Sequence, residues 1–158
     1  MAIAINNPDG YGMSYPDLAG RKNQIRLYKN AHDLYISYFR VKKDRSLPVM
    51  LHFRFATCGA RTPLNTQPFA LHDGNTIAHN GVIHYLSDSF ANLEGKQSDS
   101  RKLVDIINRN KMPFQDYYDM LNCITGKFAI LDRDGNFFWT SKHEWKYDRL
   151  DLYSNLYF

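Results

Sequence analysis

Apolar and polar residues follow two different periods along this chain. Residues 11–15 and 24–29 alternate with a period of two, as half-buried strands do. The run of Asn, Pro, Asp and Gly at residues 6–10 provides turn chemistry ahead of the first of these segments. We therefore expect the two segments to form a hairpin across the loop at residues 16–22.

Three other segments repeat apolar residues every three or four positions, which predicts helices. In residues 31–43 the repeat consists of Leu34, Tyr35, Tyr38, Phe39 and Val41. The Ser-Asp-Ser sequence at residues 98–100 offers capping side chains ahead of an apolar face at residues 103–107. Residues 114–124 carry the third helical pattern.

Short apolar runs predict buried strands between these helices. Residues 49–55 form one such run, and residues 77–83 form another that is interrupted by Asn80 and Gly81. The segment between them, residues 57–71, contains Gly and Pro and has little periodicity. A loop of that length is often functional, so we expect it to contribute to a site.

Residues 127–140 are predicted to form a hairpin. Residues 127–131 and 136–140 are apolar and flank an Asp-Arg-Asp-Gly turn, which is a strong hairpin signal. Strands therefore bracket helices along the chain, and no internal repeat is present. The pattern predicts an α+β layered fold built as a single domain over residues 1–158.

Composition places the chain among globular proteins. Apolar residues make up 44% and charged residues 23% of the sequence, which excludes a disordered chain. The net charge of +4 comes from dispersed basic residues, so nucleic-acid binding is not expected. No apolar run is long enough to cross a bilayer, and two cysteines make no disulfide framework. We expect a soluble cytoplasmic protein without a membrane contact.

Metal and cofactor sites are not predicted. The six histidines contain no His-x-x-x-His pair, and carboxylates lie near them only at Asp73 and Asp88. A phosphate-binding Gly-rich loop is absent from the sequence. Any chemistry is therefore expected to come from the side chains and backbone alone.

An Asn-Gly pair inside an apolar strand has two physical explanations. Asn80 and Gly81 favour a bulge or a tight turn, which is a purely structural role. Alternatively, the Asn80 amide and the Gly81 backbone N–H form an oxyanion hole, in which the small Gly lets a substrate approach closely. The two residues alone leave both interpretations open.

Charged residues near this pair favour a small zwitterionic ligand. Arg54 ends a predicted strand, and arginine is suited to bidentate capture of a carboxylate. Thr57 opens the long loop beside it, and Asp99 at a predicted helix start could hold an ammonium group. One cation, one anion and two oxyanion donors describe a site for an α-amino acid whose side-chain carbonyl is attacked. Glutamine fits that description.

These motifs together resemble a known family. The sequences HFRFATCG at residues 52–59, NTQPF at residues 65–69, IAHNGVI at residues 77–83 and SDS at residues 98–100 are similar to the glutaminase domain of class II glutamine amidotransferases, which are N-terminal-nucleophile hydrolases. NPDGYG at residues 7–12 and GKFAI at residues 126–130 extend the resemblance over most of residues 1–140. The closest resemblance is to compact stand-alone versions of the kind found in phages.

The resemblance implies a four-layer αββα sandwich that hydrolyses glutamine to glutamate and ammonia. It implies that Arg54 and Thr57 bind the substrate carboxylate and that Asp99 holds the amino group. Asn80 and Gly81 would form the oxyanion hole. Relatives pass ammonia to a synthase, which here would be a separate protein partner.

The family nucleophile, an amino-terminal cysteine, has no counterpart in this sequence, because position 2 is Ala2. Three explanations stay open: a cysteine replaced by alanine, a natural loss of the nucleophile, and a first strand that is missing from this chain. Cys58 is the other thiol near the motif, and a free cysteine is most often a small buried apolar residue. The expected protein is therefore glutamine-binding and inactive in this form; the alternative is a non-catalytic interaction protein that binds a host protein or nucleotide.

Overall fold

The computed structural model describes residues 6–17, 22–45, 47–87, 97–148 and 151–154. In these residues the protein is a mixed α+β fold with three α-helices and antiparallel sheets. The strands are β1 (Gly10–Pro16), β2 (Asn23–Tyr28), β3 (Met50–Arg54), β4 (Phe69–Ala70), β5 (Thr76–Asn80), β6 (Lys127–Leu131), β7 (Phe137–Trp139), β8 (Lys146–Asp148) and β9 (Asp151–Tyr153). The helices are α2 (Ala31–Arg45), α3 (Asp99–Arg109) and α4 (Phe114–Asn122), with short 3-10 turns η1 (Pro63–Asn65) and η2 (Lys142–Glu144).

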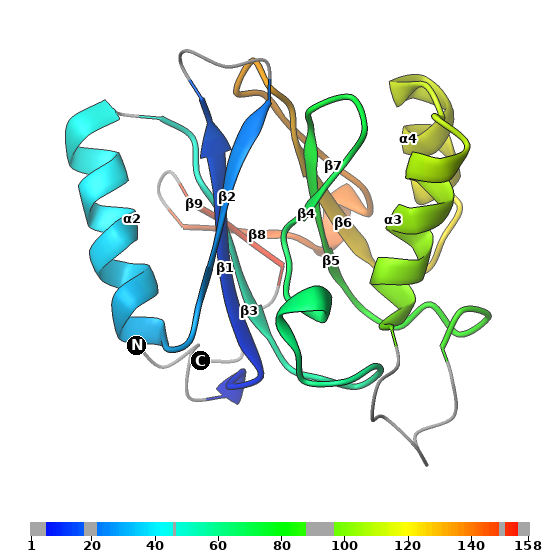
Figure 1. Ribbon diagram of the computed structural model, residues 1–158. Coiled ribbons are helices and arrows are strands. Elements are labelled where there is room, and N and C mark those ends of the chain that lie inside the picture. The colour runs from blue at the N-terminus through cyan, green and yellow to red at the C-terminus, as the bar shows by residue number, and fades with distance from the viewer. Residues whose placement is uncertain (1–5, 18–21, 46, 88–96, 149–150, 155–158) are drawn as a thin grey trace.

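Two sheets form the centre of the molecule. The first has the strand order β2-β1-β3 and the second the order β4-β5-β6-β7, while β8 and β9 pair with each other. Figure 1 shows α2 outside the first sheet and α3 with α4 outside the second, so both sheets lie between helices. Every strand pair is antiparallel.

Apolar packing joins each helix layer to its own sheet. Leu34 and Val41 of α2 are buried against alternate residues of β1. On the other side, the buried face of α3 and α4 meets β5 and β6 in the largest apolar cluster. That cluster consists of Phe69, Leu71, Ile77, Ile83, Leu103, Val104, Ile107, Tyr117, Leu121, Phe128 and Ile130. Burial of these side chains is the main driving force for the helix-on-sheet arrangement.

The contact between the two sheets is different, because hydrogen bonds between buried polar groups cross it. The Ser14 hydroxyl of β1 lies 2.9 Å from the Thr76 hydroxyl of β5. Asn23 Nδ2 of β2 donates to the Leu131 carbonyl of β6 at 2.7 Å, and a small apolar cluster around Met50 lies beside these bonds. Such directional bonds fix how the sheets sit on each other more tightly than apolar contact alone.

The same contact sets the direction of the two strands that carry candidate residues. Met50 pairs with Ser14, which bonds Thr76, and further along His52 Nε2 lies 3.3 Å from the His79 carbonyl. β3 and β5 therefore run in the same direction and end at the same edge of the molecule. The last residue of β3 is Arg54, and β5 ends at Asn80.

Most elements predicted from the sequence are confirmed. The hairpin of residues 11–29, the three helices and the hairpin of residues 127–140 are present as β1–β2, α2, α3, α4 and β6–β7. Two predictions were wrong. The strand predicted at residues 77–83 ends at Asn80, because Gly81 has φ +146° and turns the chain. The loop predicted at residues 57–71 contains the short strand β4, because Phe69 and Ala70 pair with β5. No helix within the described ranges is long and apolar enough to cross a membrane.

Gly12 of β1 lies against the backbone of Gln67 in the loop at residues 57–71, and this contact gives a testable prediction. A Cβ added to Gly12 would lie 1.9 Å from the Gln67 carbonyl oxygen and 2.8 Å from its carbon, which are backbone atoms that cannot move aside cheaply. Gly12→Ala should therefore lower the free energy of unfolding by about 3 kcal/mol or more. Urea unfolding followed by circular dichroism measures this change.

Gly10→Ala is the matched control on the same strand. A Cβ there would meet the Thr66 side chain, with its Oγ1 at 2.6 Å, and this side chain can move at the cost of its hydrogen bond to the Thr62 carbonyl. We expect a loss of about 1 kcal/mol for this variant. Equal losses at the two positions would contradict the proposed backbone contact.

Candidate functional site

The buried Arg54 side chain bonds the start of the loop at residues 57–71. Arg54 is 4% exposed. Its Nη1 donates to the Ala60 carbonyl at 3.0 Å, and its Nη2 donates to the Cys58 and Gly59 carbonyls at 2.9 and 3.2 Å. A planar guanidinium can meet several carbonyls at once, so these bonds wrap residues 58–60 around the side chain.

Asn65 connects this loop to the start of α3. Its Nδ2 donates to the Ala60 carbonyl at 2.9 Å, and its Oδ1 accepts from the Ser98 backbone N–H at 2.9 Å. Gly59 lies so close to Ser98 that an added Cβ would be 2.5 Å from the Ser98 nitrogen. The end of β3, the loop and the N-terminus of α3 therefore meet at one place.

Asp99 lies in the first turn of α3, directly after the capping residue Ser98. It is 4% exposed, and its Oδ2 accepts from the Ile83 N–H while its Oδ1 accepts from the Ser100 N–H, both at 2.6 Å. A carboxylate is favoured there by the free N–H groups and dipole of a helix N-terminus. Asp99 thereby ties the segment after Gly81 to α3.

The charges of two carboxylates act on the buried guanidinium. Burial lowers the pKa of Arg54 below its ordinary value, and the nearby charges of Asp9 and Asp99 oppose that shift. Asp9 also accepts from the Ala56 N–H at 2.8 Å and lies 3.0 Å from the exposed Arg61. The charges of Arg54 and Asp99, the predicted cation and anion, thus act on each other.

Of the remaining predicted residues, the structure describes Thr57, Asn80 and Gly81. Thr57 is half-buried in the bend after β3. Asn80 ends β5, and its amide donates to Ser154 instead of contacting either charge. Gly81 is exposed and has φ +146°, a conformation that favours glycine. Ala2 lies outside the described residues.

Two neutral histidines lie behind the candidate site. Burial lowers the pKa of His52 to about 4, and the nearby His79 and Arg54 add to that effect, against the bond to the His79 carbonyl. Burial also lowers the pKa of His79, opposed by Asp99. The His79 ring stacks on Phe128, with centroids 4.3 Å apart. Both imidazoles are therefore neutral parts of the packed interior at neutral pH.

Hydrogen bonds join His79 to Asp99 through Ser100. His79 Nδ1 lies 2.9 Å from the Ser100 hydroxyl, which donates to Asp99 Oδ1 at 3.2 Å. Gln67 bonds both backbone groups of His79: its Oε1 accepts from the N–H at 2.6 Å, and its Nε2 donates to the carbonyl at 3.3 Å. The end of β5, next to Asn80, is consequently fixed by Gln67 and by Ser100.

Sequence reasoning missed several residues of this arrangement. It interpreted Asp9 as turn chemistry and as part of a motif, although its side chain is 4% exposed and bonds the Ala56 N–H. It assigned no role to Ser154, and nothing in the local sequence marks that serine as a neighbour of Asn80. Asn65 and Gln67 were noticed only as part of a motif, whereas their bonds connect the loop to α3 and to β5.

The arrangement offers charged groups and hydrogen-bond donors. Within the described ranges, no group of three or more His, Cys, Asp and Glu side chains is placed to hold a metal ion. Cys58 is buried beside the guanidinium, with its carbonyl bonded to Arg54. A buried thiol is not exposed to a substrate, so its position is that of a core residue.

Comparisons with models of protein families and with curated proteins gave no match for this chain.

The neutral histidines predict a pH dependence of stability. The folded pKa of His52, about 4, lies below its unfolded value of 6.5. Its stabilising contribution is therefore complete above pH 6.5 and is lost as the pH falls from there toward 4. This loss amounts to about 3 kcal/mol for His52.

His52→Gln removes the titrating group and keeps a side-chain amide donor. We expect the free energy of unfolding of this variant to fall less between pH 7 and 4 than that of the unmodified protein, as urea titrations at several pH values would measure. His84→Gln, at an exposed position, is the control and should leave the slope unchanged. The same slope for His52→Gln and the unmodified protein would contradict the buried neutral state of His52.

Proposed function

We propose that this protein binds glutamine with the fold and site of a class II glutamine amidotransferase. The two sheets between helix layers support the idea that the fold is the four-layer αββα sandwich of N-terminal-nucleophile hydrolases. The motifs at residues 52–59, 77–83 and 98–100, which carry the sequence resemblance, converge in space through Gly59, Ser98 and Ile83.

The placement of Arg54 and Asp99 on segments that meet through Gly59 and Ser98, where the two charges act on each other, is the observation that carries this proposal. A free α-amino acid has a carboxylate and an ammonium group on one carbon, so its receptor needs a cation and an anion close together. Arg54 has five N–H groups, of which three donate to loop carbonyls. Asp99 Oδ2 accepts one N–H and has a second lone pair. Both charges thus keep bonding capacity for a ligand.

Ligand entry requires the loop to move. Arg54 and Asp99 are each 4% exposed, and residues 58–60 cover the guanidinium. A substrate carboxylate would replace one or more loop carbonyls, because a charged acceptor bonds a guanidinium more strongly than a neutral one. Asn80 and Gly81 would then donate to the side-chain carbonyl at the strand end, where Gly81 leaves room.

Hydrolysis needs a nucleophile that Ala2 does not provide. In the proposed function the chain binds glutamine, and glutamate and ammonia form only where a cysteine takes that position. The acceptor of ammonia would be a separate synthase.

Binding of glutamine analogues tests the proposal by calorimetry. L-Glutamine should bind, whereas N-acetyl-L-glutamine and the α-methyl ester of L-glutamine should each bind at least about tenfold more weakly, because each leaves a buried charge unpaired. Asp99→Asn should weaken L-glutamine to a similar extent and cause little further loss for the N-acetyl analogue. Equal affinity for all three ligands, or no binding of L-glutamine, would refute the site.

The Ala2→Cys chain with Met1 removed then decides between binding and hydrolysis. Glutamate and ammonia from L-glutamine support an amidotransferase site. Binding of glutamine by this variant without product would restrict the function to recognition.

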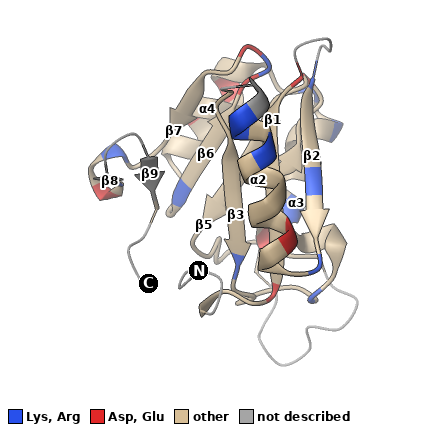
Figure 2. Cartoon of the chain, turned by 90° about the vertical axis from the view of Figure 1, so that its left-hand side faces the viewer, with Lys and Arg blue, Asp and Glu red and all other residues tan. Residues whose placement is uncertain are grey.

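A second candidate function, binding of a protein partner, is favoured by the basic surface of β2 and α2 (Figure 2). Residues 22–43 carry six basic and one acidic side chain, a net charge of +5 against +4 for the whole chain. Figure 2 shows Lys and Arg on α2 and β2 on this side. Phe39 is 63% and Ile36 42% exposed among these charges. A basic face with exposed apolar side chains suits an acidic protein surface.

Capture from a bacterial lysate tests this second function. The unmodified protein should retain one stoichiometric acidic partner, and high salt should release it. Phe39→Ser combined with Lys43→Glu should abolish capture, while Lys111→Glu, far along the chain at the end of α3, should preserve it. Retention that survives the α2 substitutions would place the partner elsewhere.

A further inference from the structure

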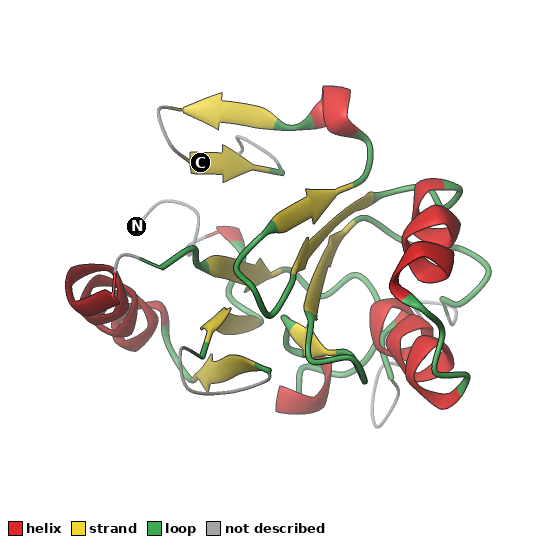
Figure 3. Cartoon of the chain, turned by 90° about the horizontal axis from the view of Figure 1, so that it is seen from above, coloured by secondary structure: helices red, strands yellow, loops and turns green. Residues whose placement is uncertain are grey.

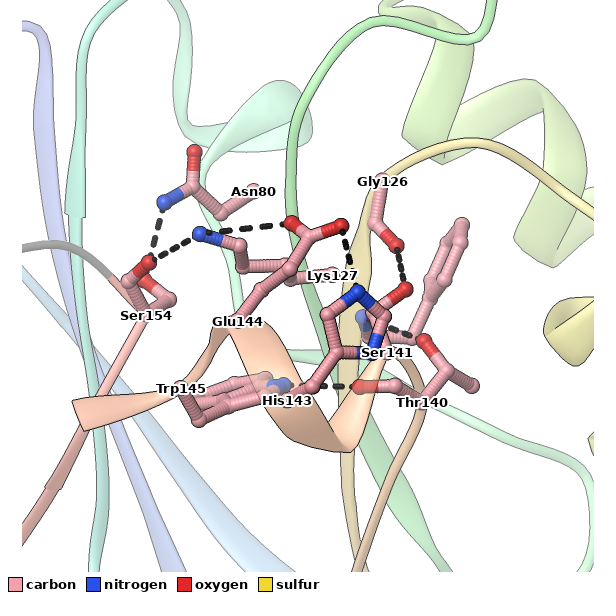
Figure 4. A network of polar contacts seen from close by, with 10 residues as sticks. Asn80, Gly126, Lys127, Thr140, Ser141, His143, Glu144, Trp145 and Ser154 are labelled. Carbon is pink, nitrogen blue, oxygen red and sulfur yellow. Dashed lines mark hydrogen bonds and ion pairs between the residues drawn. The ribbon is translucent and has the colours of Figure 1, made fainter. Parts of the chain in front are cut away.

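The amide of Asn80 is fixed by a residue from the far end of the chain. Asn80 Nδ2 donates to the Ser154 hydroxyl at 2.9 Å, across 74 sequence positions. Figure 4 shows this bond at the end of β5. An asparagine amide has two N–H groups, so a bond on one of them sets the plane of the amide and leaves the second for another acceptor.

Ser154 is in turn held by the strand neighbour of Asn80. Lys127 of β6 pairs in register with Asn80 of β5. Its Nζ donates to the Ser154 carbonyl at 2.7 Å and lies 3.6 Å from the Glu144 carboxylate. Asn80, Lys127 and Ser154 therefore form a closed ring in which one strand pairing and two hydrogen bonds support one another (Figure 4).

These bonds attach a segment that has little other support from strand pairing. Within the described residues β8 and β9 pair only with each other. Figure 3 shows this hairpin apart from the two larger sheets. The Trp145 indole N–H donates to the Thr140 carbonyl at 2.7 Å, which anchors the beginning of the segment to the end of β7. The position of Ser154 thus depends on its contacts with Asn80 and Lys127.

We infer that Ser154 is a positioning residue for the Asn80 amide and that Lys127 holds it in place. This inference rests on the proposed function, in which the Asn80 amide donates to the side-chain carbonyl of glutamine. A donor that is already oriented does not lose rotational freedom when the ligand arrives, and it therefore stabilises the bound carbonyl more than a free one. Ser154 acts through Asn80 and does not touch the ligand.

Two ligands that differ only at the side-chain amide test the inference. L-Norvaline has the same α-carbon groups as L-glutamine but no side-chain carbonyl. Calorimetry on the full chain should show that Ser154→Ala weakens L-glutamine about five- to tenfold, the size of one lost hydrogen bond. Affinity for L-norvaline should stay within about twofold, which is below the effect of a single hydrogen bond.

Three further variants complete the experiment. Ser154→Thr keeps the hydroxyl and should retain the unmodified affinity for glutamine. Lys127→Met removes the anchor of Ser154 and should reduce glutamine affinity selectively, by less than Ser154→Ala. Ser87→Ala is the matched control, because the Ser87 hydroxyl bonds the nearby His84 carbonyl at 3.0 Å, away from Asn80, and it should change neither affinity.

Each other outcome overturns the inference in a recognisable way. Equal losses for both ligands in Ser154→Ala would show a merely structural role. Tighter glutamine binding in that variant would show that Ser154 competes with the ligand for the amide. An unmodified protein that binds neither ligand would refute the proposed function itself, and the positioning role with it.

Discussion

The buried guanidinium of Arg54 is the constraint on which the candidate site depends. A charged group that is 4% exposed must be matched by acceptors, because the cost of removing it from water is otherwise several kcal/mol or more. Three loop carbonyls and the charges of Asp9 and Asp99 meet that requirement. The loop, the turn before β1 and the start of α3 therefore have to gather around one side chain.

The contact between the sheets brings the second half of the site to the same edge. Ser14 and His52 have polar partners across the contact, namely the Thr76 hydroxyl and the His79 carbonyl. Directional bonds of this kind tolerate few alternative registers, since a shift by one residue would leave buried groups unpaired. Arg54 and Asn80 can share an edge only because β3 and β5 are aligned in this way.

Local patterns were sufficient to predict most elements of the fold. The capping sequence ahead of α3 and the Asp-Gly turn between β6 and β7 act within a few residues, so their effect is visible in the sequence. The motif residues Arg54 and Asp99 were likewise found from their types and placement. The hydrogen-bond acceptors of Arg54, however, are backbone carbonyls. Every residue has a backbone carbonyl, so the residue types in the sequence do not indicate which ones Arg54 bonds.

Long-range partners are the part that sequence patterns could not provide. Asp9 bonds the Ala56 N–H across 47 positions, and Ser154 bonds Asn80 across 74. A serine or an aspartate in a polar segment is compatible with many roles, and only the packing of sheets and termini selects one. The same limitation applies to His79, whose neutral state follows from burial rather than from its neighbours in sequence.

The two halves of the site differ in how they can respond to a ligand. The carbonyls that Arg54 bonds belong to residues 58–60, close to it in sequence, so in the proposed function this loop opens while the surrounding sheets stay in place. The amide half is satisfied by Ser154, which is tied to Lys127 on the strand next to Asn80. Motion there would break a bond across the molecule. In the proposed glutamine complex, the ligand would therefore displace the loop with its carboxylate and meet an already oriented donor at its side-chain carbonyl. Recognition of the side-chain carbonyl would be rigid, and recognition of the α-carbon groups would be adaptable.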